Sequence, residues 1–289
     1  MPTIAVNGVD LYYEETGSGT PLVFVHEFAG DYRSWAPQVR FFSRRYRVIT
    51  YNARGYPPSS VPTDGAVYSE EQNIEDLHAL IRGLGLGRAH ICGLSMGGNV
   101  TLKMGLSHPD VCRSLVVAGA GYGSTNRETF QRDVGEVAAR FEREGAEVFG
   151  EEYARGSSRA RFIQKDPHGW EEFKEQLKQH SSLGSALTQR GVQAKRTPLV
   201  DLGADLARIT TPTLVINGDE DDLCLEAGLV LKRAMPNCAL AVFPNCGHTL
   251  NLEEPALFNQ MVLDFLTTVD AGRWQGRTRT DTSLLSERR

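Results

Sequence analysis

The sequence has few features that would direct a protein to a membrane or to nucleic acid. No apolar run in its 289 residues approaches the roughly 18 residues that a membrane-crossing helix needs. Its formal net charge is -5, whereas nucleic-acid binding requires a basic surface. Residues 1–6 contain neither the basic nor the apolar segment of a secretion signal. We therefore expect no membrane or nucleic-acid partner and a cytoplasmic location.

Cysteine is also scarce and irregularly spaced. The chain has five cysteines, an odd number, and no C-x-x-C pair: Cys92, Cys112, Cys224, Cys238 and Cys246. This pattern disfavours a disulfide framework and a zinc site, and it predicts reduced, buried thiols. A catalytic cysteine is a minor alternative, because the chain offers a better nucleophile.

Short apolar strands alternate with amphipathic helices over most of the chain. This alternation predicts a mostly parallel sheet with helices on both faces, which is an α/β fold. An N-terminal hairpin is expected from strands at 4–6 and 9–15 around the turn dipeptide Asn7-Gly8. The other predicted strands are 22–25, 48–51, 89–92, 111–118, 213–216 and 239–243, and the predicted helices are 35–42, 69–84, 98–107, 225–234 and 255–268.

The middle of the chain interrupts this alternation. Between residues 121 and 196 the sequence is charged and helix-forming, with helices expected at 127–144, 147–164 and 170–187. We interpret 123–196 as an all-helical cap inserted between two parts of one core, 1–122 and 197–268. Residues 269–289 contain few apolar side chains and are predicted to be a disordered tail.

The candidate nucleophile is Ser95, which lies in the pattern G-x-S-x-G between a predicted strand and a predicted helix. A nucleophile at the apex of such a turn has a strained backbone, so the residues two positions away must be small. The N–H groups of the following helix point toward the serine and favour negative charge on a substrate oxygen.

A candidate base and several candidate acids follow later strands. His248 lies in the loop after the strand 239–243, and four consecutive acids, residues 219–222, follow the strand 213–216. The carboxyl ends of parallel strands share one edge of the sheet, so these side chains and Ser95 can meet there. The chain order serine, acid, histidine is the order expected for this arrangement. An acidic run of this kind is otherwise an ordinary solvated loop.

Together these motifs resemble the α/β-hydrolase superfamily, in the branch of esterases, lactonases and C–C hydrolases that carries a helical cap. The resemblance covers about residues 4–268 and is weakest in the cap; its motifs are residues 26–30, 52–56, 93–98, 218–221 and 247–255. It implies Asp221, three residues after Gly218, as the acid that orients His248. Asp222 is the second choice.

The resemblance also implies an oxyanion hole formed by the backbone N–H groups of Phe28 and Met96, with His26 as a structural residue. Glu27 departs from the family pattern, which has glycine there. Glu27 can face solvent, line the pocket, or pair with Arg33 or Arg54, and we favour the pairing. The pocket candidates are Glu27, Leu94, Phe130 and Trp170, although aromatic residues of the cap can equally serve to pack it.

The predicted function is the hydrolysis of a small ester or lactone through an acyl-enzyme on Ser95, with no metal and no cofactor. The partner is a small-molecule substrate, and a homo-oligomer is left open. The alternatives are a C–C bond hydrolase of diketone-type substrates and a small-molecule receptor on the same scaffold. Dinucleotide binding is set aside, because the glycine-rich residues 83–87 precede a predicted strand instead of following one.

Overall fold

An eight-stranded sheet forms the centre of the protein, as seen in a computed structural model that describes residues 2–276. The strand order is β1-β2-β4-β3-β5-β6-β7-β8. β1–β2 and β2–β4 pair antiparallel, and the other neighbours pair parallel. The strands are β1 Thr3–Val6, β2 Val9–Thr16, β3 Pro21–Val25, β4 Arg47–Tyr51, β5 Ala89–Leu94, β6 Cys112–Ala118, β7 Thr213–Gly218 and β8 Cys238–Phe243. The predicted α/β architecture is confirmed.

The predicted N-terminal hairpin is present. Its turn residues Asn7 and Gly8 have φ angles of 45° and 79°. A two-residue hairpin turn of this handedness needs positive φ at both central positions, and asparagine and glycine adopt it most readily. The hairpin therefore forms because of its turn chemistry as much as because of its alternating apolar residues.

Helices cover both faces of the sheet. One apolar cluster joins Leu22 and Phe24 of β3 to Trp35 and Phe258, beside α1 Ala36–Phe42, α9 Leu250–Glu253 and α10 Pro255–Asp270. The alternate residues of β3 face a second cluster with α2 Glu70–Gly83, α3 Met96–Ser107 and α8 Asp222–Ala234. Short 3-10 turns, η1 Tyr32–Trp35 and η2 Gly65–Val67, lie in the connections. Every second strand residue thus faces the opposite helical layer.

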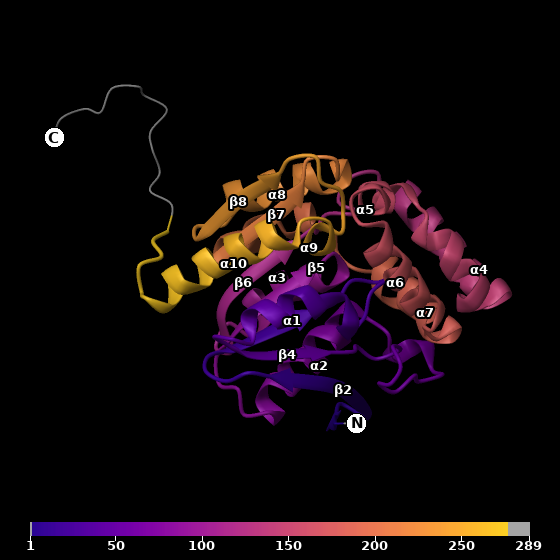
Figure 1. Ribbon diagram of the computed structural model, residues 1–289, viewed down its shortest axis with the longest axis horizontal. Coiled ribbons are helices and arrows are strands. Elements are labelled where there is room, and N and C mark those ends of the chain that lie inside the picture. The colour runs from indigo at the N-terminus through magenta and orange to yellow at the C-terminus, as the bar shows by residue number, and fades with distance from the viewer. Residues whose placement is uncertain (1, 277–289) are drawn as a thin grey trace.

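The segment between β6 and β7 is helical and contains no strand among the described residues. Figure 1 shows α4, α5, α6 and α7 gathered on one side of the sheet. The elements are α4 Arg127–Ala154, η3 Ser157–Arg159, α5 Ala160–Lys165, α6 Pro167–Lys178, α7 Ser182–Thr188, η4 Gln189–Gln193 and η5 Leu199–Arg208. The predicted all-helical insertion is confirmed.

The internal boundaries of the cap differ from the prediction. Gly145 has φ 81°, so α4 contains a kink, and its second part ends at Ala154 instead of continuing to residue 164. The predicted helix 170–187 is divided, because the Ser181 side chain caps the start of α7 by accepting from the N–H of Gly184.

The C-terminal end of the core also extends further than predicted. α10 continues to Asp270, and the ring of Trp274 packs against Phe265 with centroids 4.7 Å apart. Residues 277–289 of the predicted tail lie outside the described residues. Among residues 2–276, no helix is both long and apolar enough to cross a membrane.

Candidate active site

Ser95 lies at a sharp turn directly after β5 and directly before α3. Its backbone angles are φ 55° and ψ −112°, a conformation that costs a non-glycine residue on the order of 1–3 kcal/mol. The surrounding backbone maintains this conformation. The N–H of Ser95 donates to the carbonyl of Ala118 at 2.8 Å, and its carbonyl accepts from the backbone N–H and side-chain amide of Asn99.

The two glycines of the motif are required by close backbone contacts. A Cβ atom on Gly97 would lie 2.2 Å from the carbonyl oxygen of Val25, and one on Gly93 would lie 2.1 Å from the carbonyl oxygen of Gly97. Helix α3 therefore packs directly on the end of β3, which places its N-terminus beside the loop that contains Phe28. The predicted steric reason for the G-x-S-x-G pattern agrees with these contacts.

Asp221 and His248 are hydrogen-bonded. Nδ1 of His248 lies 2.8 Å from Oδ2 of Asp221, and the two residues are only 4% and 3% exposed. Burial raises the pKa of the Asp221 carboxyl, but the charge and hydrogen bond of His248 outweigh burial and hold that pKa below its ordinary value. Asp222 is exposed and begins α8. Of the two acids considered, Asp221 is therefore the one that contacts the histidine.

His248 lies beside the turn that contains Ser95. Gly119 lies between them: it is the residue after Ala118, whose carbonyl accepts the hydrogen bond from the N–H of Ser95. A Cβ atom on Gly119 would be 3.5 Å from Cε1 of His248 and 3.2 Å from Cδ1 of Leu94. Among the described residues, no hydrogen bond joins the Ser95 hydroxyl to His248. Such bonds are often long before substrate binds and shorten in the complex.

Glu253 holds the His248 loop in place. Its carboxylate accepts from the N–H of Gly247 at 2.6 Å and from the N–H and hydroxyl of Thr249, both at 2.9 Å. The backbone on both sides of His248 is thus bound to one buried carboxylate. Glu253 belongs to the motif 247–255, but the sequence alone indicated no role for it.

The predicted oxyanion donors have free N–H groups. Neither Phe28 nor Met96 donates a backbone hydrogen bond to another described residue, and both residues are buried. The Phe28 carbonyl accepts from the hydroxyl of Tyr56 at 3.0 Å. These contacts leave both amides available for an incoming oxygen atom.

His26 braces the same loop. Its Nε2 accepts from the N–H of Ala53 at 3.0 Å, so Nδ1 carries the proton that it donates to the carbonyl of Glu27 at 2.7 Å. Burial lowers the pKa of His26 to about 4, so the ring is neutral near pH 7.

Glu27 forms an ion pair, but the predicted partners are wrong. Arg33 pairs with Asp31 at 2.6 Å, and Arg54 pairs with Asp76 at 2.7 Å. Glu27 instead binds Arg159 in η3 of the cap, and both side chains are buried. The prediction failed on the partner because arginines nearby in sequence already have closer acids, and the cap supplies the remaining charge.

The aromatic pocket candidates from the cap have their own packing partners. The Trp170 indole donates to the carbonyl of Ala154 at 2.9 Å, and Phe130 lies beneath the guanidinium groups of Arg127 and Arg196. These contacts account for both residues as packing residues, so their place in a substrate pocket stays a prediction.

Phe28 is in contact with a different part of the cap. Its ring packs edge-on against Phe141 and Tyr153 of α4, with centroids 5.9 Å and 5.6 Å apart. These two aromatic residues therefore lie over the loop that carries a predicted oxyanion donor. Neither Phe141 nor Tyr153 was assigned to the site from the sequence.

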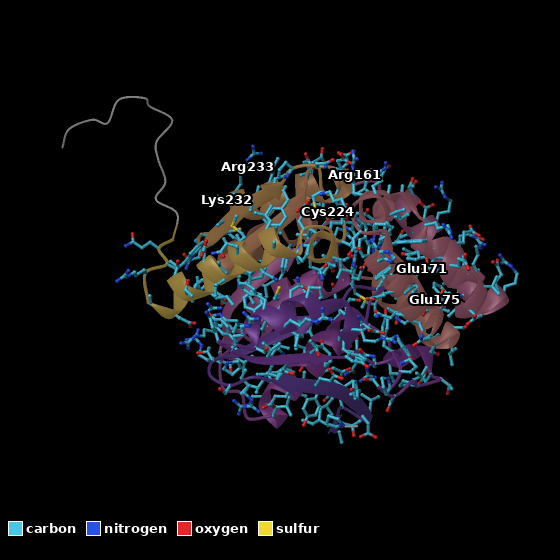
Figure 2. The ribbon with its side chains drawn as sticks, viewed as in Figure 1. Arg161, Glu171, Glu175, Cys224, Lys232 and Arg233 are labelled. Carbon is cyan, nitrogen blue, oxygen red and sulfur yellow. The ribbon has the colours of Figure 1, made fainter. Side chains whose placement is uncertain are left out.

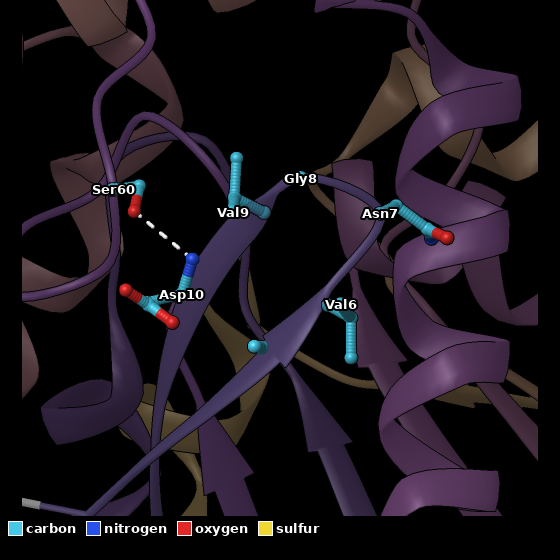
Figure 3. A pocket seen from close by; sticks show the side chains of 7 residues that line it. Val6, Asn7, Gly8, Val9, Asp10 and Ser60 are labelled. Carbon is cyan, nitrogen blue, oxygen red and sulfur yellow. Dashed lines mark hydrogen bonds between the residues drawn. The ribbon is translucent and has the colours of Figure 1, made fainter.

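Two cavities lie away from Ser95. One, of about 280 Å³, lies at the N-terminal hairpin and is lined by residues 5–10 and Ser60, whose hydroxyl accepts from the N–H of Asp10 (Figure 3). The other, of about 530 Å³, lies between α1 and the cap and includes Arg33 and Phe173. Neither is lined by Ser95, Asp221 or His248, and Ser95 is only 8% exposed. Neither of these two cavities therefore reaches the serine.

The surroundings of Asp221 include two residues that the sequence analysis did not assign. The ring centroids of Tyr122 and His248 are 4.7 Å apart. The Sγ atom of Cys224 lies within 4.8 Å of a carboxylate oxygen of Asp221 and of a ring nitrogen of His248. Figure 2 labels Cys224 on the core side of the boundary with the cap. Arg161 lies on the cap side, where it pairs with Glu220 at 2.5 Å (Figure 2).

The properties of the cysteines do not favour a catalytic cysteine. All five are free and buried, as predicted. Burial raises the pKa of Cys224 well above its ordinary value and raises that of Cys112 and Cys238 to about 12. The thiolate, which is the nucleophilic form, is therefore scarce near neutral pH.

Among residues 2–276, two side-chain groups have the composition of metal ligands. They are Asp221 with Cys224 and His248, and the more exposed group Glu75, His78 and His108 on α2 and after α3. In the first group, Nδ1 of His248 is already engaged by Asp221. In the second, Nε2 of His108 is hydrogen-bonded to Glu75 at 2.8 Å.

The chain is similar to known hydrolases over nearly its whole length. The 2-hydroxy-6-oxononadienedioate/2-hydroxy-6-oxononatrienedioate hydrolase of Burkholderia vietnamiensis is 28% identical, and the match covers 91% of this chain and 93% of that protein. The solved structure of a thermophilic esterase from Thermogutta terrifontis is 28% identical, with a TM-score of 0.80, covering 92% of this chain and 97% of that one.

A third similar protein is a solved enzyme described as degrading N-acyl homoserine lactones. It is 27% identical, with a TM-score of 0.76, and the match covers 91% of this chain and 100% of that one. Residues 20–255 match the family described as the alpha/beta hydrolase fold. Because this match spans most of the chain, and because the similar hydrolases are covered over nearly their whole length, the chain belongs to the α/β-hydrolase family and is a hydrolase.

Proposed function

We propose that the protein is a serine hydrolase that cleaves a small ester or lactone through an acyl-enzyme on Ser95. The observation that carries the proposal is the buried Asp221–His248 hydrogen bond beside the positive-φ turn at Ser95. A base whose tautomer is fixed by a carboxylate, next to a serine at the apex of a strained turn, is the arrangement that acyl transfer needs.

The first half-reaction forms the acyl-enzyme. Asp221 accepts a hydrogen bond from the Nδ1–H of His248, so Nε2 is the basic nitrogen and takes the proton of the Ser95 hydroxyl. The serine oxygen bonds to the carbonyl carbon of the substrate, and the N–H groups of Phe28 and Met96 stabilise the resulting oxyanion. Protonated His248 then gives its proton to the leaving alcohol, and the bond to that alcohol breaks.

The second half-reaction releases the acid. His248 takes a proton from water, whose oxygen attacks the acyl carbon, and the oxyanion forms again beside the same two amides. Collapse of this intermediate returns the proton to Ser95 and frees the carboxylic acid. In a lactone, the alcohol and the acid are parts of one molecule, so the product is a single hydroxy acid.

Replacing the proposed nucleophile tests this function. Ser95→Ala is expected to lower kcat for nitrophenyl butyrate by at least about 10³-fold, because the remaining groups stabilise the oxyanion but cannot form the acyl-enzyme. A fluorophosphonate probe should label the wild type and leave the variant unlabelled. An unchanged thermal unfolding temperature serves as the control for folding. Normal turnover by Ser95→Ala would overturn the proposal.

A second candidate is a C–C bond hydrolase of diketone-type substrates. It is favoured by the 28% identity to the oxononadienedioate hydrolase over 91% of this chain. The same serine, base and amides would act on a ketone carbonyl, with a carbon leaving group. Activity on a vinylogous 1,5-diketone together with none on nitrophenyl acetate or butyrate would select this candidate over the first.

A further inference from the structure

A buried ion pair joins the cap to the loop of the proposed oxyanion hole. Glu27 follows β3 in the core, and Arg159 lies 132 residues later in η3 of the cap. The side chains of Arg159 and Glu27 are 4% and 3% exposed. An unpaired buried charge is strongly destabilising, so each side chain requires the other in place.

The position of Glu27 gives this pair a mechanical connection to the site. The N–H of Phe28 belongs to the same planar peptide unit as the carbonyl of Glu27. That carbonyl accepts from Nδ1 of His26 at 2.7 Å and from the N–H of Gly30 at 3.3 Å. The orientation of the Phe28 N–H therefore depends on the contacts that hold Glu27.

Arg159 is positioned by the cap and not by the core alone. Its guanidinium lies over the ring of Phe173 in α6, 5.3 Å from the centroid. The same cap packs Tyr153 and Phe141 on the ring of Phe28. A shift of the cap would thus move the partner of Glu27 and the contacts of Phe28 together.

We propose that the Glu27–Arg159 pair couples the position of the cap to the orientation of the Phe28 N–H, so that the oxyanion hole is complete only when the cap is closed. The inference rests on the proposed function. Both residues are positioning residues: they act on the oxyanion through the Phe28 peptide and not by touching the reacting atoms. The glutamate that departs from the family pattern thereby acquires a role.

The test compares Glu27→Gln with a matched variant, Asp76→Asn. Asp76 is also a buried carboxylate bound to an arginine, Arg54, but it lies on α2 and contacts no cap residue through that pair. We expect Glu27→Gln to lower kcat for nitrophenyl butyrate by at least about tenfold with little change in KM, since losing an oxyanion donor outright costs about 10²–10³ in kcat. Asp76→Asn should lower stability and leave kcat unchanged.

Two further measurements separate coupling from general damage. Hydrogen exchange should become faster in residues 26–30 and 157–165 together in Glu27→Gln and in Arg159→Gln, and in neither segment in Asp76→Asn. The double variant Glu27→Gln with Arg159→Met removes both charges, so its kcat should be no lower than that of either single variant. If Glu27→Gln does not fold, this double variant and Arg159→Lys supply the same comparison.

The outcomes distinguish this inference from the proposed function. Ester cleavage that depends on Ser95, with kcat unchanged in Glu27→Gln, would overturn the coupling and leave the proposed function standing. If the wild type cleaves no ester, but hydrogen exchange still becomes faster in residues 26–30 and 157–165 together in the Glu27 and Arg159 variants, the proposed function is overturned. The link between the cap and the Phe28 loop then still stands. A loss of kcat equal in Glu27→Gln and Asp76→Asn would reduce the ion pair to a general stabilising contact.

Discussion

The clearest contrast between single residues is that between Asp221 and Asp222. They are adjacent in sequence, yet Asp221 is buried against His248 and Asp222 is exposed at the start of α8. The turn after β7 directs only the first of them inward. Of these two adjacent carboxylates, only that of Asp221 is placed to orient His248, whereas that of Asp222 faces water.

This contrast predicts different effects of two matched substitutions. Asp221→Asn should lower kcat for an ester by on the order of 10⁴-fold, because an uncharged amide cannot stabilise the charged imidazole and its NH2 group can donate to Nδ1, which selects the wrong tautomer of His248. Asp222→Asn should change kcat by less than about twofold. Steady-state kinetics of both variants, with circular dichroism as the control for folding, decide between the two acids. A larger loss in Asp222→Asn would reverse the assignment.

At this scale, patterns with a local cause were predictable and pairings across the chain were not. Ser95 and His248 were selected as candidates because each follows a strand, and strand ends share an edge, where the structure places both residues beside Gly119. The partner of Glu27 was misassigned, since nothing in the local sequence marks Arg159, which is 132 residues away. The ring of Tyr122 likewise packs against the ring of His248, which is far away in the sequence, only through folding.

Among the structural elements, the loop between β8 and α10 depends on one side chain. Glu253 binds the backbone of Gly247 and Thr249, the neighbours of His248. The adjacent Glu254 instead pairs with Lys165 and is 36% exposed. These neighbours, the last residue of α9 and the residue after it, offer a matched comparison.

Glu253→Gln should lower both stability and kcat. Its amide group can accept only one of the two backbone N–H donors, and an unpaired buried donor costs about 1–3 kcal/mol. The loop would then hold His248 less firmly, so kcat should fall while KM changes little. Glu254→Gln should change neither by much. Urea unfolding and ester kinetics measure both effects, and equal behaviour of the two variants would contradict this role.

The elements of the core were predicted more accurately than those of the cap. The central strands β5 and β7 are fully buried and bounded by turn residues, so their sequence pattern is strong. In the cap, charged helix-forming residues continue through the breaks. The kink at Gly145 and the division before α7 depend on single residues, Gly145 and Ser181, whose effect is set by packing.

For the whole molecule, buried histidines make stability depend on pH. Burial lowers the pKa of both His26 and His90 to about 4, whereas a histidine in the unfolded chain titrates near 6.5. Between these values the unfolded state binds more protons than the folded state. The free energy of unfolding therefore falls as the pH drops from 6.5 toward about 4, by up to about 1.4 kcal/mol per pH unit for each histidine.

Urea unfolding at pH 7 and pH 5 measures this dependence. We expect a lower midpoint at pH 5, and a smaller difference between the two pH values in His90→Asn, where one of the two groups no longer titrates. Equal midpoints for the wild type at pH 7 and pH 5 would contradict the prediction.

The place of the helical insertion has a consequence for how such enzymes diversify. The insertion leaves the core after β6 and returns at β7, and these two strands are paired neighbours, with Ala118 opposite Ile216. A different helical segment can therefore be grafted between them without rethreading the sheet or disturbing the serine, acid and histidine. The graft must satisfy one condition: it has to bring its own cation to Glu27, or that glutamate must be exchanged along with it.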